Sequence, residues 1–70
     1  MDLTAIRELC YQRNITYAQL ERELDLGNGI ISGWARHKPR YNGVRKVADY
    51  FGCTVDEIAP GVFAKGESIQ

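Results

Sequence analysis

Apolar residues recur along this chain at the three-and-four spacing that gathers side chains on one face of an α-helix. The pattern predicts a first helix that begins after Asp2, its N-cap, and ends at Asn14. Its inner face carries Leu3, Ile6, Leu9, Cys10 and Arg13. A second helix opens at Thr16, because Gln19 three residues later completes a capping box. Its expected inward residues are Leu20 and Leu24, with Ile15 as the hydrophobic staple before the cap.

A tight turn separates the second helix from a third. Asp25 and Leu26 form this turn, and Gly27 is the expected N-cap of the third helix. The third helix is predicted at about residues 28–36. Two short helical patterns that meet at a turn, with apolar residues where they would touch, are typical of a helix-turn-helix.

The third helix carries two interior glycines, Gly29 and Gly33. Each interior glycine costs a helix up to about 1 kcal/mol relative to alanine. We therefore expect this helix to depend on tertiary packing through Ile31 and Trp34. On the apolar side of its helix, Trp34 is expected to be a core residue.

The pattern predicts a fourth helix at about residues 41–51, with Gly52 as a left-handed C-terminal cap. Thr54 and Glu57 form a second capping box, which opens a short fifth helix that Pro60 ends. The inward residues of these helices are Val44, Val47, Ala48, Phe51 and Ile58. No segment predicts a strand, so the expected fold is all-α, a compact five-helix domain.

Composition supports a single domain. The chain has 70 residues, of which 44% are hydrophobic and 26% charged, as in ordinary globular proteins. We predict one helix-turn-helix domain at residues 1–60, followed by a short flexible tail at residues 61–70. No run approaches the roughly 18 apolar residues of a membrane span, and no signal-peptide pattern is found. The sequence therefore predicts a cytoplasmic protein.

The residues that carry chemistry are few. Cys10 and Cys53 both fall at apolar positions, which favours buried free thiols over a disulfide. One histidine and two cysteines cannot assemble a four-ligand zinc site, and no cofactor is predicted. No His–Cys or His–carboxylate pair has a spacing that joins it on one face, so no enzyme activity is expected.

Charge is unevenly distributed along the chain, although the formal net charge is zero. No acidic residue occurs between Leu26 and Ala48. That segment contains five basic residues: Arg36, Lys38, Arg40, Arg45 and Lys46. Either this segment is an ordinary solvated face, or it meets a polyanion.

These residues together resemble the DNA-binding domain of the Cro and phage-repressor family, over about residues 6–58. The resemblance rests on two segments, Lys38-Pro39 after the third helix and the run at residues 47–58, and on Leu20, Leu24, Ile31, Ser32 and Trp34. It implies a lambda-repressor-like fold. It also implies a sequence-specific transcriptional regulator, a Cro-like protein or repressor of phage or mobile-element type, which binds an operator in double-stranded DNA.

The resemblance also implies which residues touch DNA. Side chains on the outer face of the recognition helix read bases, here Asn28, Gly29, Ile30, Ser32 and Gly33. Phosphate contacts are expected at Thr16, Tyr17, Gly27, Arg36, His37, Lys38, Arg40, Tyr41 and Asn42. Tyr17 is expected to be too polar-facing to belong to the core. Two reading positions lack a side chain, so binding should be dominated by phosphate contacts and weaken with salt.

Members of this family bind DNA as two-fold dimers. Apolar residues available for a homodimer contact are Ile58, Val62 and Phe63, although the last two could fold back over the core instead.

The chain departs from the family pattern at Glu21, usually a small residue, and at Asp25, often glycine. Glu21 is expected to point outward. The alternative function is a protein-interaction module, antirepressor or antitoxin-like, with weak base readout.

Overall fold

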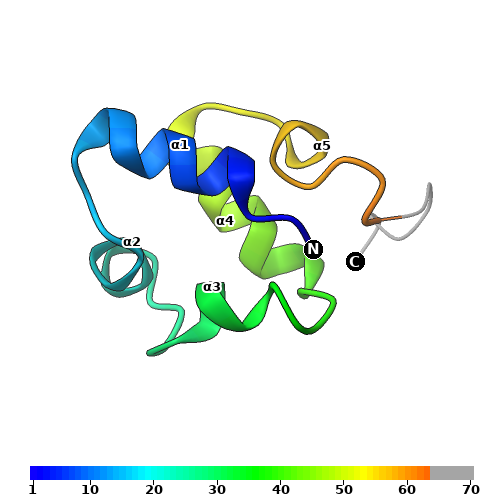
Figure 1. Cartoon of the computed structure of the whole chain (residues 1–70), viewed down its shortest axis with the longest axis horizontal. Helices are drawn as coiled ribbons and strands as arrows, with labels where there is room; N and C mark the ends of the chain where they lie inside the picture. Colours follow the sequence, from blue (N-terminus) through cyan, green and yellow to red (C-terminus); the bar gives the residue numbers. More distant parts are fainter. Residues whose placement is uncertain (64–70) are drawn as a thin grey trace.

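The computed structural model describes residues 1–63 of the chain, and within them it contains five α-helices and no strands (Figure 1). The helices are α1 (Thr4–Arg13), α2 (Tyr17–Glu23), α3 (Ile30–Gly33), α4 (Tyr41–Phe51) and α5 (Val55–Ile58). The predicted all-α, five-helix architecture is confirmed. None of these helices is long and apolar enough to cross a membrane.

Helix α1 begins one residue later than the sequence predicts. Leu3 occupies the N-cap position, and the Asp2 carboxylate instead accepts hydrogen bonds from the backbone N–H of Thr4 (2.9 Å) and from its hydroxyl (2.6 Å). Asp2 therefore still satisfies a donor of the first turn, from one position outside the cap. At the other end Asn14 adopts the left-handed conformation and ends the helix, as predicted.

The capping box that opens α2 is confirmed. The Thr16 hydroxyl accepts from the backbone of Gln19 (3.1 Å), and the Gln19 side chain accepts from the backbone of Thr16 (3.0 Å). After α2 the chain turns sharply at Asp25, whose φ of 57° lies in the left-handed region. Residues other than glycine pay a steric cost in that region, because Cβ crowds the backbone.

The predicted N-cap of α3 is wrong. Gly29, with φ of 80°, caps this helix, while Gly27, with φ of 92°, lies within the turn. Two left-handed glycines, separated by Asn28, thus precede the helix, which begins later than predicted. After Gly33 the backbone tightens, since Trp34 N–H donates to the Ile31 carbonyl three residues back (3.0 Å). The α-helical part of the predicted segment 28–36 is therefore only one turn long.

Helices α4 and α5 follow the prediction closely. Gly52 ends α4 in the left-handed conformation, with φ of 72°. Thr54 and Glu57 form the predicted capping box of α5, with backbone-to-side-chain hydrogen bonds of 3.1 and 2.7 Å. Contacts join α4 to α5, α1 to α5 and α2 to α3, so that the last two lie side by side as a helix-turn-helix (Figure 1).

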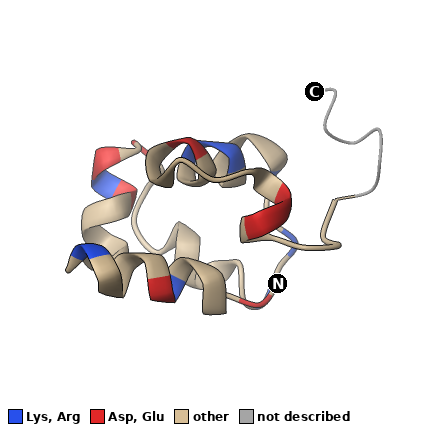
Figure 2. Cartoon of the chain, turned by 90° about the horizontal axis from the view of Figure 1, so that it is seen from above, with Lys and Arg blue, Asp and Glu red and all other residues tan. Residues whose placement is uncertain are grey.

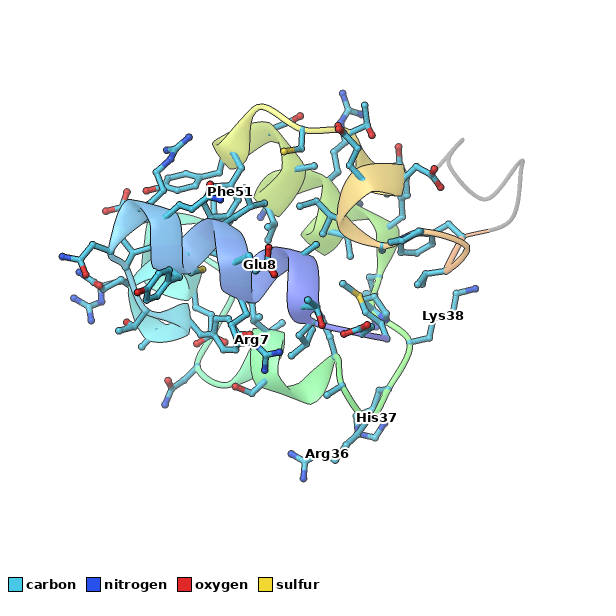
Figure 3. The ribbon with its side chains drawn as sticks, turned by 45° about the horizontal axis from the view of Figure 1, so that its top comes forward. Arg7, Glu8, Arg36, His37, Lys38 and Phe51 are labelled. Atoms are coloured by element: carbon cyan, nitrogen blue, oxygen red, sulfur yellow. The ribbon has the colours of Figure 1, made fainter. Side chains whose placement is uncertain are left out.

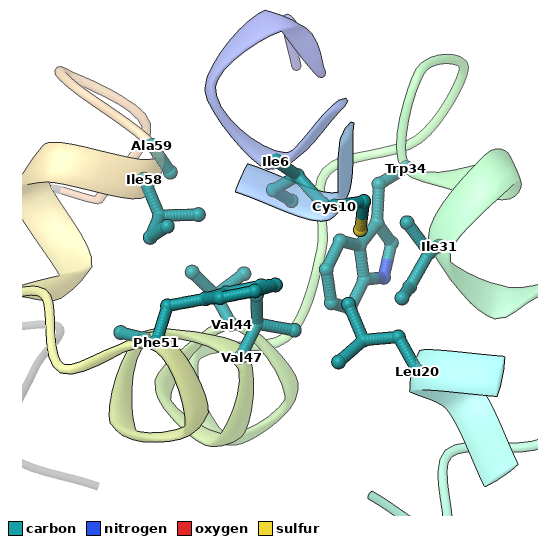
Figure 4. Packing of buried hydrophobic residues seen from close by; sticks show 11 residues of the cluster. Ile6, Cys10, Leu20, Ile31, Trp34, Val44, Val47, Phe51, Ile58 and Ala59 are labelled. Carbon is teal, nitrogen blue, oxygen red and sulfur yellow. The ribbon is translucent and has the colours of Figure 1, made fainter. Parts of the chain in front are cut away.

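The core lies where these helices converge (Figure 4). Its buried hydrophobic residues are Ile6, Cys10, Leu20, Ile31, Trp34, Val44, Val47, Ala48, Phe51, Ile58 and Ala59. In Figure 4 the Trp34 indole lies between Cys10, Ile31 and Leu20, which joins the end of α3 to α1 and α2. Trp34 is thus a core residue, as expected. Both cysteines are free, but Cys53 is only half-buried.

The predicted tail at residues 61–70 falls into two parts. Residues 64–70 lie outside the described residues. Val62 and Phe63 pack against the core, and the Phe63 ring meets the Tyr41 ring edge-on at 5.4 Å between centroids. The chain therefore folds back over the start of α4 up to Phe63.

Candidate nucleic-acid interface

A groove of about 540 Å³ runs between α3 and the first turns of α4. We call it the basic groove, after the four basic side chains on its walls, His37, Lys38, Arg40 and Lys46. The rest of the lining is Leu26, Gly29, Ile30, Gly33, Trp34, Pro39, Asn42 and Gly43. Of the described residues that line it, none is acidic. The exposed part of α3 and the basic segment therefore share one surface.

The basic side chains of this surface project from a short loop. Arg36, His37, Lys38 and Arg40 lie between α3 and α4, and all four are exposed. Figure 3 shows Arg36 and His37 reaching outward from the body of the molecule. The Lys38 ammonium lies 5.6 Å from the centre of the Phe63 ring, a cation–π distance.

The two basic residues of α4 have different surroundings. The Lys46 ammonium lies 3.5 Å from the Leu24 carbonyl at the end of α2 and faces the basic groove. Arg45 instead lies 3.7 Å from the Asp49 carboxylate, one turn along the same helix. Both partners of that pair are well exposed, so the pair adds little stability. Lys46 is not among the phosphate contacts expected from the sequence, although its place in the acid-free segment could have indicated it.

Acidic residues gather elsewhere. Figure 2 shows them on α5, close to the point where the chain leaves toward the C terminus. They also occur on α2 and in the turn that follows, where Glu21 and Asp25 line a second hollow of about 310 Å³. The groove and the second hollow thus differ in charge: the described lining of the groove holds no acidic residue, whereas the second hollow holds Glu21 and Asp25.

The residues expected to read bases do not share one surface. Gly29, Ile30 and Gly33 line the basic groove, and the Ile30 side chain is 42% exposed. Asn28 lines the second hollow, on the side of Glu21. Ser32 is exposed on the same short helix. Only the apolar part of the expected reading face therefore lies within the groove.

The expectation that Glu21 points outward is wrong. Its side chain is 4% exposed, and its two carboxylate oxygens accept hydrogen bonds from the backbone N–H groups of Gly29 (3.0 Å) and Ile31 (2.8 Å). Helix α3 has no cap of its own, since Gly29 has no side chain. A carboxylate from α2 therefore satisfies the free donors at the start of α3, where the helix dipole also favours negative charge.

The expected phosphate site at the start of α2 is partly occupied. The Thr16 N–H donates to its own capping partner, Gln19, so it is not free for a phosphate. The expectation for Tyr17 is wrong, because this residue is half-buried and packs against the core. Burial accordingly raises the pKa of the Tyr17 hydroxyl above its usual value. Both residues line a third hollow, together with Arg7 and Tyr11 of α1.

The residues expected to mediate a dimer contact contribute to the fold. Ile58 is buried at 1% exposure and belongs to the core, so it offers no surface to a partner. Val62 and Phe63 pack back over the core, which is the arrangement the sequence left open as the alternative. Tyr41, an expected phosphate contact, is half-buried against Phe63.

A family model for the Cro/C1-type HTH DNA-binding domain matches residues 5–60. The chain belongs to this family. No curated protein and no solved structure matches the chain. As in a Cro/C1-type domain, α2, the turn and α3 form the helix-turn-helix, and this chain is accordingly a DNA-binding protein of the regulatory type.

Residues 1–63 contain no group of three or more histidine, cysteine or acidic residues suited to a metal ion. Burial raises the pKa of the Cys10 thiol, which keeps this sulfur protonated and unreactive. On the surface that carries the basic groove, the exposed groups are thus cations, the Asn42 amide and the apolar side chain of Ile30.

Proposed function

We propose that the protein is a transcriptional regulator of phage or mobile-element type that binds an operator through α3 and the basic groove. The observation that carries this proposal is the groove itself. Among the residues that the structure describes, four basic side chains and no acidic one line it, directly beside the exposed face of α3. Phosphates of a double helix along the groove walls would bring α3 against the base edges.

Phosphate contacts supply most of the affinity in this proposal. Arg36, Lys38, Arg40 and Lys46 are exposed cations, and the side chain of Asn42 adds a neutral donor. Each contact adds affinity without sequence information. His37, Gly27 and the backbone amide of Tyr17 complete the proposed set of phosphate contacts.

Base readout is proposed to come from few side chains. Ile30 is exposed enough to contact a thymine methyl group, and Ser32 offers one hydroxyl. Asn28 can bond an adenine in two places, worth about 1–3 kcal/mol of discrimination. Gly29 and Gly33 add no side chain but let the backbone of α3 approach closely.

We propose further that two copies bind adjacent half-sites about one helical turn apart. Since Ile58 is buried and Val62 and Phe63 cover the core, we expect only a small dimer contact, formed on DNA rather than in free solution. The expected signature is a monomer by sedimentation that becomes a two-to-one complex on a selected duplex.

A second candidate function is a protein-interaction module of the antirepressor or antitoxin-like type. The specific observation in its favour is the composition of the exposed α3 face, on which Ile30 is the apolar side chain and Gly29 and Gly33 leave open space. Such a face suits a protein partner as well as a thymine. A function limited to protein interaction would leave the basic groove without a role.

A binding comparison tests the proposal. Affinity is measured for the DNA that flanks the protein's own gene and for a shuffled duplex of equal composition, across a salt series. We expect tighter binding to the flanking DNA, loss of that preference in Asn28→Ala, and weaker binding to both duplexes in an Arg40→Ala/Lys46→Ala variant. Absence of binding to either duplex at low salt would instead support the protein-interaction module.

A further inference from the structure

The start of α3 is the weakest point of the helix-turn-helix. The helix has only four residues, its N-cap is a glycine, and another glycine lies at its end. A helix this short does not persist without external support. Whatever fixes its first turn therefore also fixes the direction in which its exposed side chains point.

The described contacts identify that support as Glu21. Its side chain reaches from α2 across the turn and holds the N–H groups of Gly29 and Ile31, one with each oxygen. Its backbone carbonyl also accepts from the N–H of Leu26 (2.9 Å). One residue therefore binds the turn at its beginning and at its end. Asn28 and Ile30, the proposed base contacts, alternate with the two amides that the carboxylate holds.

Charge gives Glu21 a second effect that can be measured separately. A carboxylate so near the DNA-facing side repels phosphate, so it lowers affinity for any duplex. Its capping role acts on sequence preference instead. Removal of the charge alone should raise binding to all DNA, whereas release of α3 should reduce the difference between a preferred and a shuffled duplex.

We infer that Glu21 is the positioning residue for DNA readout: it holds α3 in the orientation that lets Asn28 and Ile30 meet the bases. This inference rests on the proposed function. Glu21 does not touch DNA in this arrangement, since it is buried behind the turn. The hydrogen bonds of Glu21 link α2 to the start of α3, and the two helices are otherwise joined through hydrophobic contacts.

The test uses Glu21→Gln, with Glu23→Gln as a matched control. Both variants lose one negative charge from α2, but Glu23 is exposed, whereas Glu21 is buried and bonded to α3. The probes are a duplex selected by the wild-type protein from a random library and a shuffled duplex of the same composition. Affinities are measured at a temperature where circular dichroism shows both variants folded.

We expect Glu21→Gln to lower the ratio of selected to shuffled affinity at least tenfold, with shuffled binding unchanged or stronger. Glu23→Gln should leave the ratio within twofold of wild type. An equal ratio in both variants overturns the inference while the proposed function stands. A wild-type protein that binds neither duplex overturns both.

A measurement on the wild-type protein covers the case in which Glu21→Gln does not fold. Amide hydrogen exchange at Gly29 and Ile31 should be at least tenfold slower than in an unfolded chain. The protection should rise further on addition of the selected duplex but not of the shuffled one. Exchange at unfolded-chain rates, or an equal rise with both duplexes, would overturn the inference.

Discussion

Removal of one cation from the basic groove should change how DNA binding responds to salt. Three exposed cations line the groove, Lys38, Arg40 and Lys46. Arg36 is exposed in the loop that leads to the groove, so each chain offers four positive charges there. Each phosphate that a cation neutralises contributes about −0.9 to the slope of log K against log salt concentration. Four contacts therefore give a slope of about −3.6 for one chain, and about −7 for two chains on one duplex.

These slopes correspond to large changes in affinity. Between about 50 and 200 mM salt, one bound chain should lose about two orders of magnitude in affinity, and a pair about four. The variant Arg40→Ala should reduce the steepness of the slope by about 0.9 per chain. Fluorescence anisotropy of a labelled shuffled duplex, over that range of salt, measures the slope without any contribution from base readout.

Arg45→Ala is the matched control for this experiment. Arg45 lies on α4 next to Lys46, but its guanidinium faces the Asp49 carboxylate and is not part of the groove lining. Its removal should leave the slope unchanged. A slope that stays the same in Arg40→Ala, or falls equally in both variants, would refute the role of the groove as the phosphate-binding surface.

Three further outcomes concern stability. Asp25→Gly should raise the free energy of unfolding in urea by about 0.5–1 kcal/mol, because φ of 57° favours glycine; a decrease would contradict this account of the turn. Gly43→Ala should lower the thermal midpoint despite its gain in helix propensity, because the new Cβ would lie 3.1 Å from Cζ2 of Trp34; an unchanged or higher midpoint would contradict it. Hydrogen bonds from the Thr4 hydroxyl, and next from the Thr4 backbone, lower the pKa of Asp2 below 3.8. The ionised Asp2 carboxylate therefore stabilises the fold above pH 3.8, and this stabilisation is lost as the pH falls through the pKa of Asp2 in the folded protein. An NMR titration midpoint for Asp2 at or above 3.8 would be the opposite result.

The sequence predicted α4 with correct ends because several local signals agree there. Val44, Val47 and Phe51 repeat at helical spacing, and Gly52 adopts the left-handed conformation that ends a helix. The two capping boxes were equally readable, since the residues that bond lie three positions apart. Signals of this kind need no knowledge of the tertiary structure.

The start of α3 was not readable in the same way. Gly27 and Gly29 both suit an N-cap or a turn, and the sequence alone does not tell which of them is the N-cap of α3. In the structure, the carboxylate that bonds the start of this helix comes from Glu21, eight residues before Gly29. Glu21 shares the helical stripe of Leu20 and Leu24, so its inward position could have been read. Its partners could not, because they are backbone amides.

The distribution of cations was predicted well, and the details of the contact surface less well. Of the five basic residues in the acid-free segment, Lys38, Arg40 and Lys46 line one groove, and Arg36 and Arg45 do not. Among the residues that the structure describes, no acidic one lines that groove. Asn28, however, lies in the turn before α3 and lines the hollow that Asp25 also lines, and Tyr17 is half-buried. The direction in which a residue at the start of a one-turn helix points depends on where that helix begins. In this protein the start of α3 is bonded to Glu21.

The chain contains a single tryptophan, and Trp34 follows directly on α3 while its ring is buried among α1, α2 and α4. Indole emission depends strongly on exposure to water. Undocking of the recognition helix would therefore change the fluorescence of this one residue even if the rest of the fold stayed intact. The protein thus carries an intrinsic optical reporter of its own reading helix, usable without a label in any titration with DNA.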